Sequence, residues 1–120
     1  MPISADRRRF DALRTRYLAA DAKLREAIVV FERRYGSVVV WRPWLSAAES
    51  ARLQRLDAAK DRASRAIYAL LEAISPRSWM SGVSAHWVCA ELSWEDAVRP
   101  LSEPLSVTPP LAYGATEPLA

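Results

Sequence analysis

Apolar residues recur every three or four positions between Phe10 and Tyr35, a spacing that aligns them along one face of an α-helix. Ser4 precedes this segment as a candidate N-cap, and Gly36 follows it as a candidate C-terminal stop. We therefore predict one long helix over about residues 4–35. The apolar face of this helix consists of Phe10, Leu13, Tyr17, Ala20, Leu24, Ala27, Ile28, Phe31 and Tyr35.

A capping box opens a second helical pattern, because the hydroxyl of Ser46 can accept from the amide of Glu49 while that glutamate reaches back. Helical spacing of apolar residues and alanines continues to Ile74, and Pro76 cannot extend a helix. We predict a helix over about residues 47–75. Two long helices joined by about ten residues favour an all-α fold built on a long antiparallel helical hairpin.

Shorter signals follow the hairpin. Ser84 and Ser93 are candidate N-caps for short helices over about 85–92 and 94–99. Apolar side chains also alternate from residue 83 to residue 89, which is typical of a strand, and the β-branched segment 38–41 is a candidate partner for it. Helix and strand therefore remain alternatives for 83–89.

The last part of the chain is rich in proline, which disfavours regular structure. We predict a helical domain over residues 1–99 and an extended proline-rich tail over 100–120, either packed on the body or loose. The prolines of this tail are Pro100, Pro104, Pro109, Pro110 and Pro118.

Charge is distributed unevenly along the 120 residues. Residues 1–80 carry 16 Lys and Arg against 9 Asp and Glu, a net of +7, whereas residues 81–120 carry one Arg against five acids, a net of −4. Nearly all the basic residues are arginines, which suit bidentate pairing with carboxylate or phosphate. A charged surface that binds a partner is one interpretation; solvated helix faces tied by local pairs such as Asp21–Arg25 and Asp61–Arg65 are the other.

Tryptophan and arginine are the residues most enriched at binding hot spots, so both types mark candidate contacts with a partner. The five tryptophans lie within residues 41–94, where the helical pattern breaks, and filling the core is their alternative role. A solvated acidic patch is the simplest role for the carboxylates between residues 91 and 96. The candidate partner-binding residues are Arg33, Arg34, Trp41, Arg42, Trp44, Arg55, Arg62, Glu91, Glu95 and Asp96.

No catalytic or metal-binding motif stands out. His86 and Cys89 would supply only half of a tetrahedral zinc site, and the chain has no other His or Cys. The glycines are isolated, so no phosphate-binding loop is present. We predict a protein that is not an enzyme and needs no cofactor. A single cysteine, no long apolar run and no secretory signal predict a cytoplasmic location with no membrane contact.

In size, helical content and charged surface the whole chain resembles the small accessory proteins of phages and conjugative elements, including the anti-CRISPR inhibitors. That resemblance is one of type and rests on no shared motif. It implies a non-catalytic inhibitor that blocks a nucleic-acid-handling complex by charge and shape, with either the arginines or the acidic region as the contact surface.

The predicted function is therefore a protein-interaction module with a protein partner. A small basic regulator that binds nucleic acid is the alternative. We also predict a homodimer, because apolar residues such as Leu18, Val29 and Val30 lie beside the main apolar rows and need cover.

Overall fold

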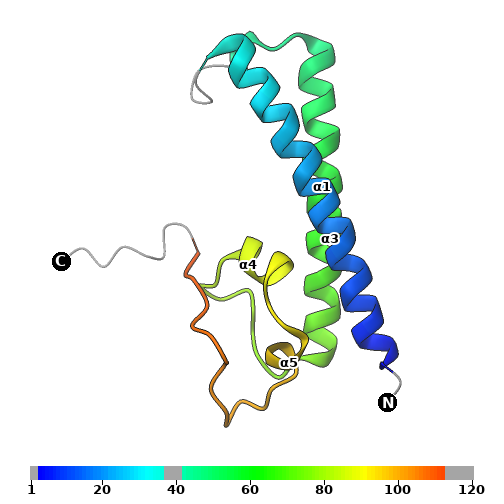
Figure 1. Cartoon of the computed structure of the whole chain (residues 1–120), viewed down its shortest axis with the longest axis vertical. Coiled ribbons are helices and arrows are strands. Elements are labelled where there is room, and N and C mark those ends of the chain that lie inside the picture. The colour runs from blue at the N-terminus through cyan, green and yellow to red at the C-terminus, as the bar shows by residue number, and fades with distance from the viewer. Residues whose placement is uncertain (1–2, 37–41, 113–120) are drawn as a thin grey trace, which may run out of the picture.

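The computed structural model describes residues 3–36 and 42–112 and shows an antiparallel pair of long helices with the shorter elements packed beside one end (Figure 1). In these residues the fold is all-α, as predicted, and the only β-type pairing is an isolated bridge between Val83 and Leu111. None of the helices described combines the length and apolarity needed to span a bilayer. The elements are α1 (Ala5–Tyr35), the 3₁₀ turn η1 (Arg42–Trp44), α3 (Ala47–Ile74), α4 (Ala85–Ala90) and α5 (Trp94–Ala97).

Local capping sets the ends of the two long helices. Ser4 accepts from the amide of Arg7 at the start of α1, and Gly36 ends that helix with a positive φ of 95°, a conformation that costs glycine little. At the start of α3, Ser46 and Glu49 form the predicted capping box with both reciprocal hydrogen bonds present. Both long helices therefore have the bounds expected from sequence to within one residue.

The short helices are shorter than predicted. Helix α4 ends at Ala90 rather than near residue 92, and α5 ends at Ala97 rather than near residue 99, before Pro100. The strand alternative for 83–89 is wrong, because Ser84 caps a helix whose side chains Trp87, Val88 and Cys89 are buried in the core. Its suggested partner segment, 38–41, lies outside the described residues.

The main core lies where the short elements pack against the hairpin. Side chains from α1 and α3 meet those of the 79–97 region there, including Trp79 and Trp87, so these two tryptophans fill the core. A second, smaller cluster of Leu24, Ala27, Phe31 and Leu53 lies further along the hairpin, and all four come from α1 and α3. The hairpin end that carries η1 therefore projects as an arm two helices thick (Figure 1).

The described part of the proline-rich segment, residues 100–112, lies on the body. The guanidinium of Arg77 donates to the carbonyl oxygens of Pro100 and Glu103. The amides of Ser84 and Ala112 complete backbone hydrogen bonds on either side of the Val83 bridge. Residues 113–120 of the predicted tail lie outside the described residues.

Candidate interaction surfaces

Exposed arginines on α3 are surrounded by alanine. The positions three, four and seven residues to either side of Arg55 are all alanine or arginine, and none is acidic. These spacings place side chains on one face of a helix, so α3 presents a face made of arginine and alanine alone. Arg52, Arg55 and Arg62 are exposed on it. The neighbours of Arg55 are Ala48, Ala51, Arg52, Ala58, Ala59 and Arg62.

Helix α1 carries a matching row. Arg9, Arg16 and Lys23 follow one another at intervals of seven residues, and all three side chains are exposed. The positions three and four residues to either side of Arg16 are Ala12, Leu13, Ala19 and Ala20, so Arg16 too has no acidic neighbour on its face. At the ends of the row, Asp6 lies three residues before Arg9 and Glu26 three residues after Lys23. Sequence reasoning selected Arg55 and Arg62 but missed the α1 row. The repeated interval of seven was the available signal.

Both rows face away from α4. The guanidinium of Arg14 donates to the carbonyl oxygen of Cys89 in α4, and the thiol of Cys89 lies 3.4 Å from the hydroxyl of Ser64, so Arg14 and Ser64 mark the α4 side of the hairpin. Arg16 comes two residues after Arg14, and Arg62 two residues before Ser64. Two residues turn a helix by about 200°, so Arg16 and Arg62 point to the opposite side.

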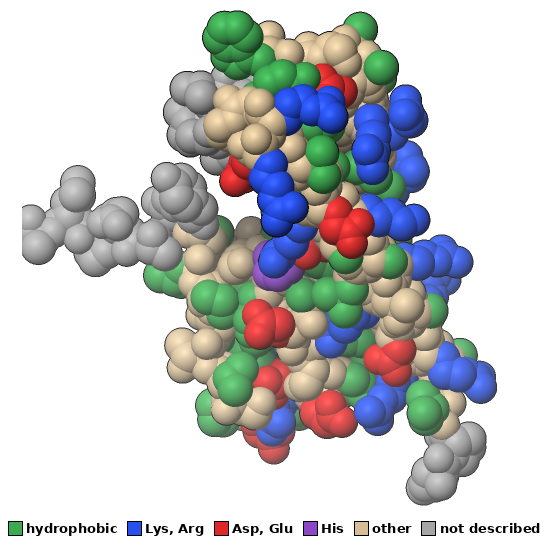
Figure 2. Space-filling view, turned by 45° about the horizontal axis from the view of Figure 1, so that its top comes forward, with side chains coloured by type: hydrophobic (Ala, Val, Ile, Leu, Met, Phe, Trp, Pro, Cys, Tyr) green, Lys and Arg blue, Asp and Glu red, His purple; other side chains and the backbone are tan. Residues whose placement is uncertain are grey.

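We call this surface the basic face. Figure 2 shows Lys and Arg side chains in a column along the edge of the hairpin that lies away from the short C-terminal elements. The basic face consists of Arg9, Arg16, Lys23, Arg52, Arg55 and Arg62.

The basic face carries unbalanced charge. Within residues 3–36 and 42–112 the ion pairs join other basic residues, such as Arg25 and Lys60 to Asp21, and Arg65 to Asp61. No carboxylate in these ranges is within 4 Å of a nitrogen of the basic face. The predicted local pairs Asp21–Arg25 and Asp61–Arg65 are thus present, but they neutralise arginines elsewhere on the helices. The charge of the basic face remains available to a partner.

The candidate partner-binding residues near the hairpin tip have different surroundings in the structure. Arg34 binds Glu49 at 2.6 Å, and Tyr35 donates to the same carboxylate at 2.7 Å, so Arg34 joins α1 to the start of α3. The hydrogen bonds from Ser46 and Tyr35, together with the charge of Arg34, hold the pKa of Glu49 below its usual value. Arg33 is exposed on α1, and Trp44 is 69% exposed. Trp41 and the side chain of Arg42 lie outside the described residues.

The acidic candidates are also separated. Glu91 and Glu95 are exposed, and Glu95 is 3.6 Å from Arg7. Asp96 is only 1% exposed, so its expected place in a solvated acidic patch is wrong. Burial disfavours its charge, but hydrogen bonds from Ser106 and Arg99 outweigh that effect and hold the pKa of Asp96 below its usual value. Asp96 therefore stabilises the fold and cannot meet a partner.

His86 and Cys89 have separate partners within the fold. The phenol of Tyr17 is 2.8 Å from Nδ1 of His86, whereas Cys89 contacts Ser64. Burial raises the pKa of the Cys89 thiol, which keeps it protonated and unreactive at neutral pH. No three His, Cys, Asp or Glu side chains in the described part of the chain are grouped to hold a metal ion.

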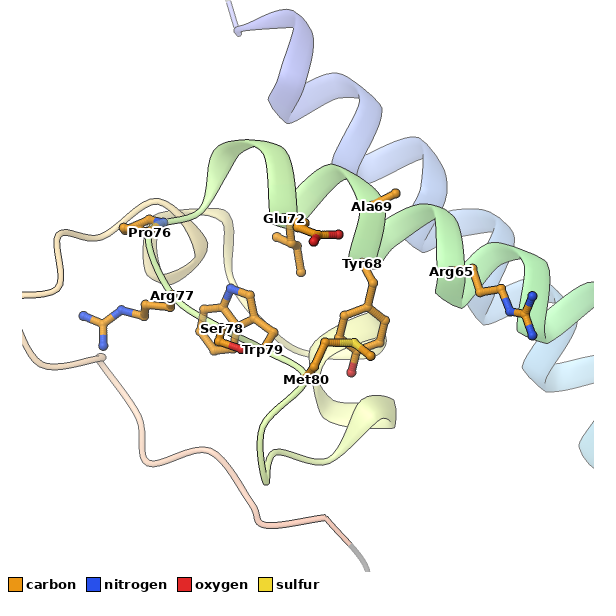
Figure 3. Close-up of a pocket in the computed structure, with 10 residues that line it drawn as sticks. Arg65, Tyr68, Ala69, Glu72, Pro76, Arg77, Ser78, Trp79 and Met80 are labelled. Carbon is orange, nitrogen blue, oxygen red and sulfur yellow. The ribbon is translucent and has the colours of Figure 1, made fainter.

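A cavity of about 620 Å³ lies between the second half of α3 and the segment that follows it. Figure 3 shows Tyr68 and Met80 among the side chains that line it, and Met80 is 76% exposed. The arginines at its border are already engaged, Arg65 with Asp61 and Arg77 with backbone carbonyls. The lining of the cavity is mixed, since polar side chains of Tyr68, Glu72 and Ser78 lie beside apolar ones such as Leu71 and Trp79.

No protein-family model, curated protein or solved structure matches this chain. Its function is therefore inferred from its own side chains.

Proposed function

We propose that this chain is a non-catalytic protein-interaction module whose basic face binds an acidic surface of a protein partner. The observation that carries the proposal is the set of six exposed Lys and Arg side chains on one side of the hairpin, with no carboxylate of the described residues paired to them. Uncompensated charge of one sign speeds encounter with a partner of opposite sign and rejects partners of like sign.

The burial of Asp96 favours the basic face over the acidic region as the contact surface. Asp96 lies in the core, and Glu95 is near Arg7. Of the three acidic candidates, only Glu91 is exposed without an ion pair to a described residue. The exposed carboxylates of this region in the described residues are Glu91, Glu95 and Glu103, which are fewer than the six side chains of the basic face. We further propose that the partner belongs to a nucleic-acid-handling complex, which the chain inhibits by occupying an acidic surface in the manner of the anti-CRISPR proteins.

Charge reversal with a matched control tests the proposed function. The double variant Arg16→Glu with Arg62→Glu changes one residue in each row of the basic face. The control, Arg8→Glu with Arg65→Glu, changes the same helices and the same net charge, but outside the basic face. Affinity capture from a lysate of the source organism, followed by mass spectrometry, should recover a partner with the wild type and the control only. Equal recovery with all three chains would contradict the proposal.

Binding of nucleic acid is the second candidate function, and the same six basic side chains favour it, because phosphate contacts need exposed Lys and Arg. A gel-shift series with duplex DNA and RNA distinguishes it. Several phosphate contacts would give a steep loss of affinity between about 50 and 200 mM salt. Absence of any shift at low salt would exclude this function and leave the protein partner.

A further inference from the structure

The two rows of the basic face run along the two sides of the surface where α1 and α3 meet. Between them the side chains are small, with Ala20 on α1 and Ala59 and Ala66 on α3 partly exposed. Alanine lets a neighbouring helix approach closely, toward the short end of the usual interaxial distance of about 8–10 Å. The basic face therefore combines a narrow strip of alanines with basic side chains along both edges.

From this arrangement we propose that the occupant of the basic face is an acidic amphipathic helix of the partner, which lies along the alanine strip with carboxylates toward both rows. This inference rests on the proposed function and names the chemistry of the partner. A third helix in this position would pack on α1 and α3 from the side opposite α4 and complete a small helical bundle.

The spacing of the basic side chains matches a helix. Arg9, Arg16 and Lys23 repeat every seven residues, as do Arg55 and Arg62. Seven residues of α-helix span about 10.5 Å. In a partner helix with a heptad repeat, two positions flank the apolar stripe. Glutamates at these positions offer carboxylates at the same interval of seven residues on both sides of the stripe. Charged pairs at such flanking positions set the choice and orientation of helical partners.

A nucleic-acid backbone fits this spacing less well. Each strand of duplex DNA places a phosphate about every 3.4 Å along the axis and winds around it, so it leaves a straight row within a fraction of a turn. The basic rows instead stay straight over three residues of α1 spaced seven apart. Apolar contact with the alanine strip also has no counterpart on a phosphate backbone. The geometry therefore favours a helix over a duplex.

Binding of designed peptides to the full chain tests this inference. The first probe is a fluorescent helical peptide of about three heptads with alanine along one stripe and glutamates at both flanking positions. The second has the same composition and net charge, but its glutamates lie on the face opposite the alanine stripe. A fluorescent DNA duplex of similar length is the third. Fluorescence anisotropy gives each affinity, and circular dichroism reports whether the first peptide gains helicity on binding.

We expect the first peptide to bind at least about tenfold more tightly than the second, since several charge pairs of a few tenths of a kcal/mol combine with alanine packing. Arg16→Glu with Arg62→Glu should remove that preference, and Arg8→Glu with Arg65→Glu should keep it. Thermal unfolding followed by circular dichroism establishes that both double variants are folded.

Three outcomes would overturn the inference. Equal affinity for both peptides would show attraction by net charge alone, which leaves the proposed function intact. Tighter binding of the duplex than of the first peptide would replace the helix with nucleic acid as occupant. No binding of the first peptide would remove the helical partner, and the capture experiment would then decide separately whether the basic face binds a protein.

Discussion

The hydroxyl of Ser106 lies 2.6 Å from Oδ2 of Asp96, and this contact fastens the proline-rich segment to α5. The backbone amide of Ser106 donates to the other carboxylate oxygen at 3.0 Å, where Arg99 also donates. A buried carboxylate that accepts from all three donors joins the short helix α5 to a segment without regular structure.

Replacement of Asp96 by alanine should therefore destabilise the protein by about 2 kcal/mol or more, because three donors lose a buried, charged acceptor. The loss should also expose residues 98–112 to limited proteolysis. Urea unfolding followed by tryptophan fluorescence measures the first effect. Glu95→Ala is the matched control, since the neighbouring side chain is exposed, and it should change stability little. Similar losses in the two variants would contradict the role given to Asp96.

The lowered pKa of Asp96 predicts a pH dependence of stability. A carboxyl group whose pKa is lower in the folded state stabilises the fold above its unfolded-state pKa, and that stabilisation is lost as pH falls through the folded-state value. The free energy of unfolding should thus fall below about pH 4, near the ordinary pKa of an Asp. The difference in the free energy of unfolding between the wild type and the neutral variant Asp96→Asn should be larger at pH 7 than at pH 3. A difference independent of pH would contradict this prediction.

Arg14 and Arg16 should behave oppositely, although two residues separate them. Arg14 donates to the carbonyl oxygens of Cys89 at 3.0 Å and Val88 at 3.1 Å, at the end of α4. Arg14→Ala should cost about 2 kcal/mol of stability, since those carbonyls lose a charged donor. Arg16→Ala should leave chemical unfolding nearly unchanged but weaken partner binding. Equal destabilisation by both substitutions would contradict the assignment of the two sides of α1.

The thiol of Cys89 should resist modification in the folded protein. It is buried, and burial raises its pKa, so the reactive thiolate is scarce at neutral pH. Labelling with a chromogenic disulfide reagent should be about 100-fold slower or more in native buffer than in urea, because it requires opening of the core. The wild type serves as its own control, since the chain has one cysteine. Comparable labelling rates in native buffer and in urea would contradict the burial of the Cys89 thiol.

Self-association is the last prediction. Packing of the C-terminal elements buries Leu71, but Leu18 and Val29 remain more than 40% exposed on α1. We expect a homodimer at tens of micromolar that covers these side chains, and Val29→Asp should shift it to monomer. Sedimentation equilibrium measures both masses. A single 13.5 kDa species of the wild type would show the dimer prediction to be wrong.

The parts of the fold that depend on neighbouring residues were predictable from sequence. Ser46 and Glu49 are three residues apart, and Pro76 acts on the residues just before it, so the bounds of α3 follow from local signals. Alternation over 83–89 is equally local, but it could not separate strand from helix, because a buried helix also presents apolar side chains in succession.

The roles of Asp96 and Arg14 depend on contacts distant in sequence, which the residue pattern does not contain. Ser106 lies in a segment without periodicity, and Arg14 meets carbonyl groups 74 and 75 residues away. The basic face is an intermediate case. Its intervals of seven residues are visible in the sequence, but only the position of α4 shows which side of the hairpin remains open.

The division of the hairpin into a packed side and an open side has an evolutionary consequence. The side chains that hold the fold together, such as Trp87, Asp96 and Arg14, gather with α4 and α5, whereas the basic face takes no part in the core. Substitutions on the open side can therefore alter what the protein binds while its stability is preserved. Related chains should keep the packed side nearly constant and vary the six basic positions as their targets change.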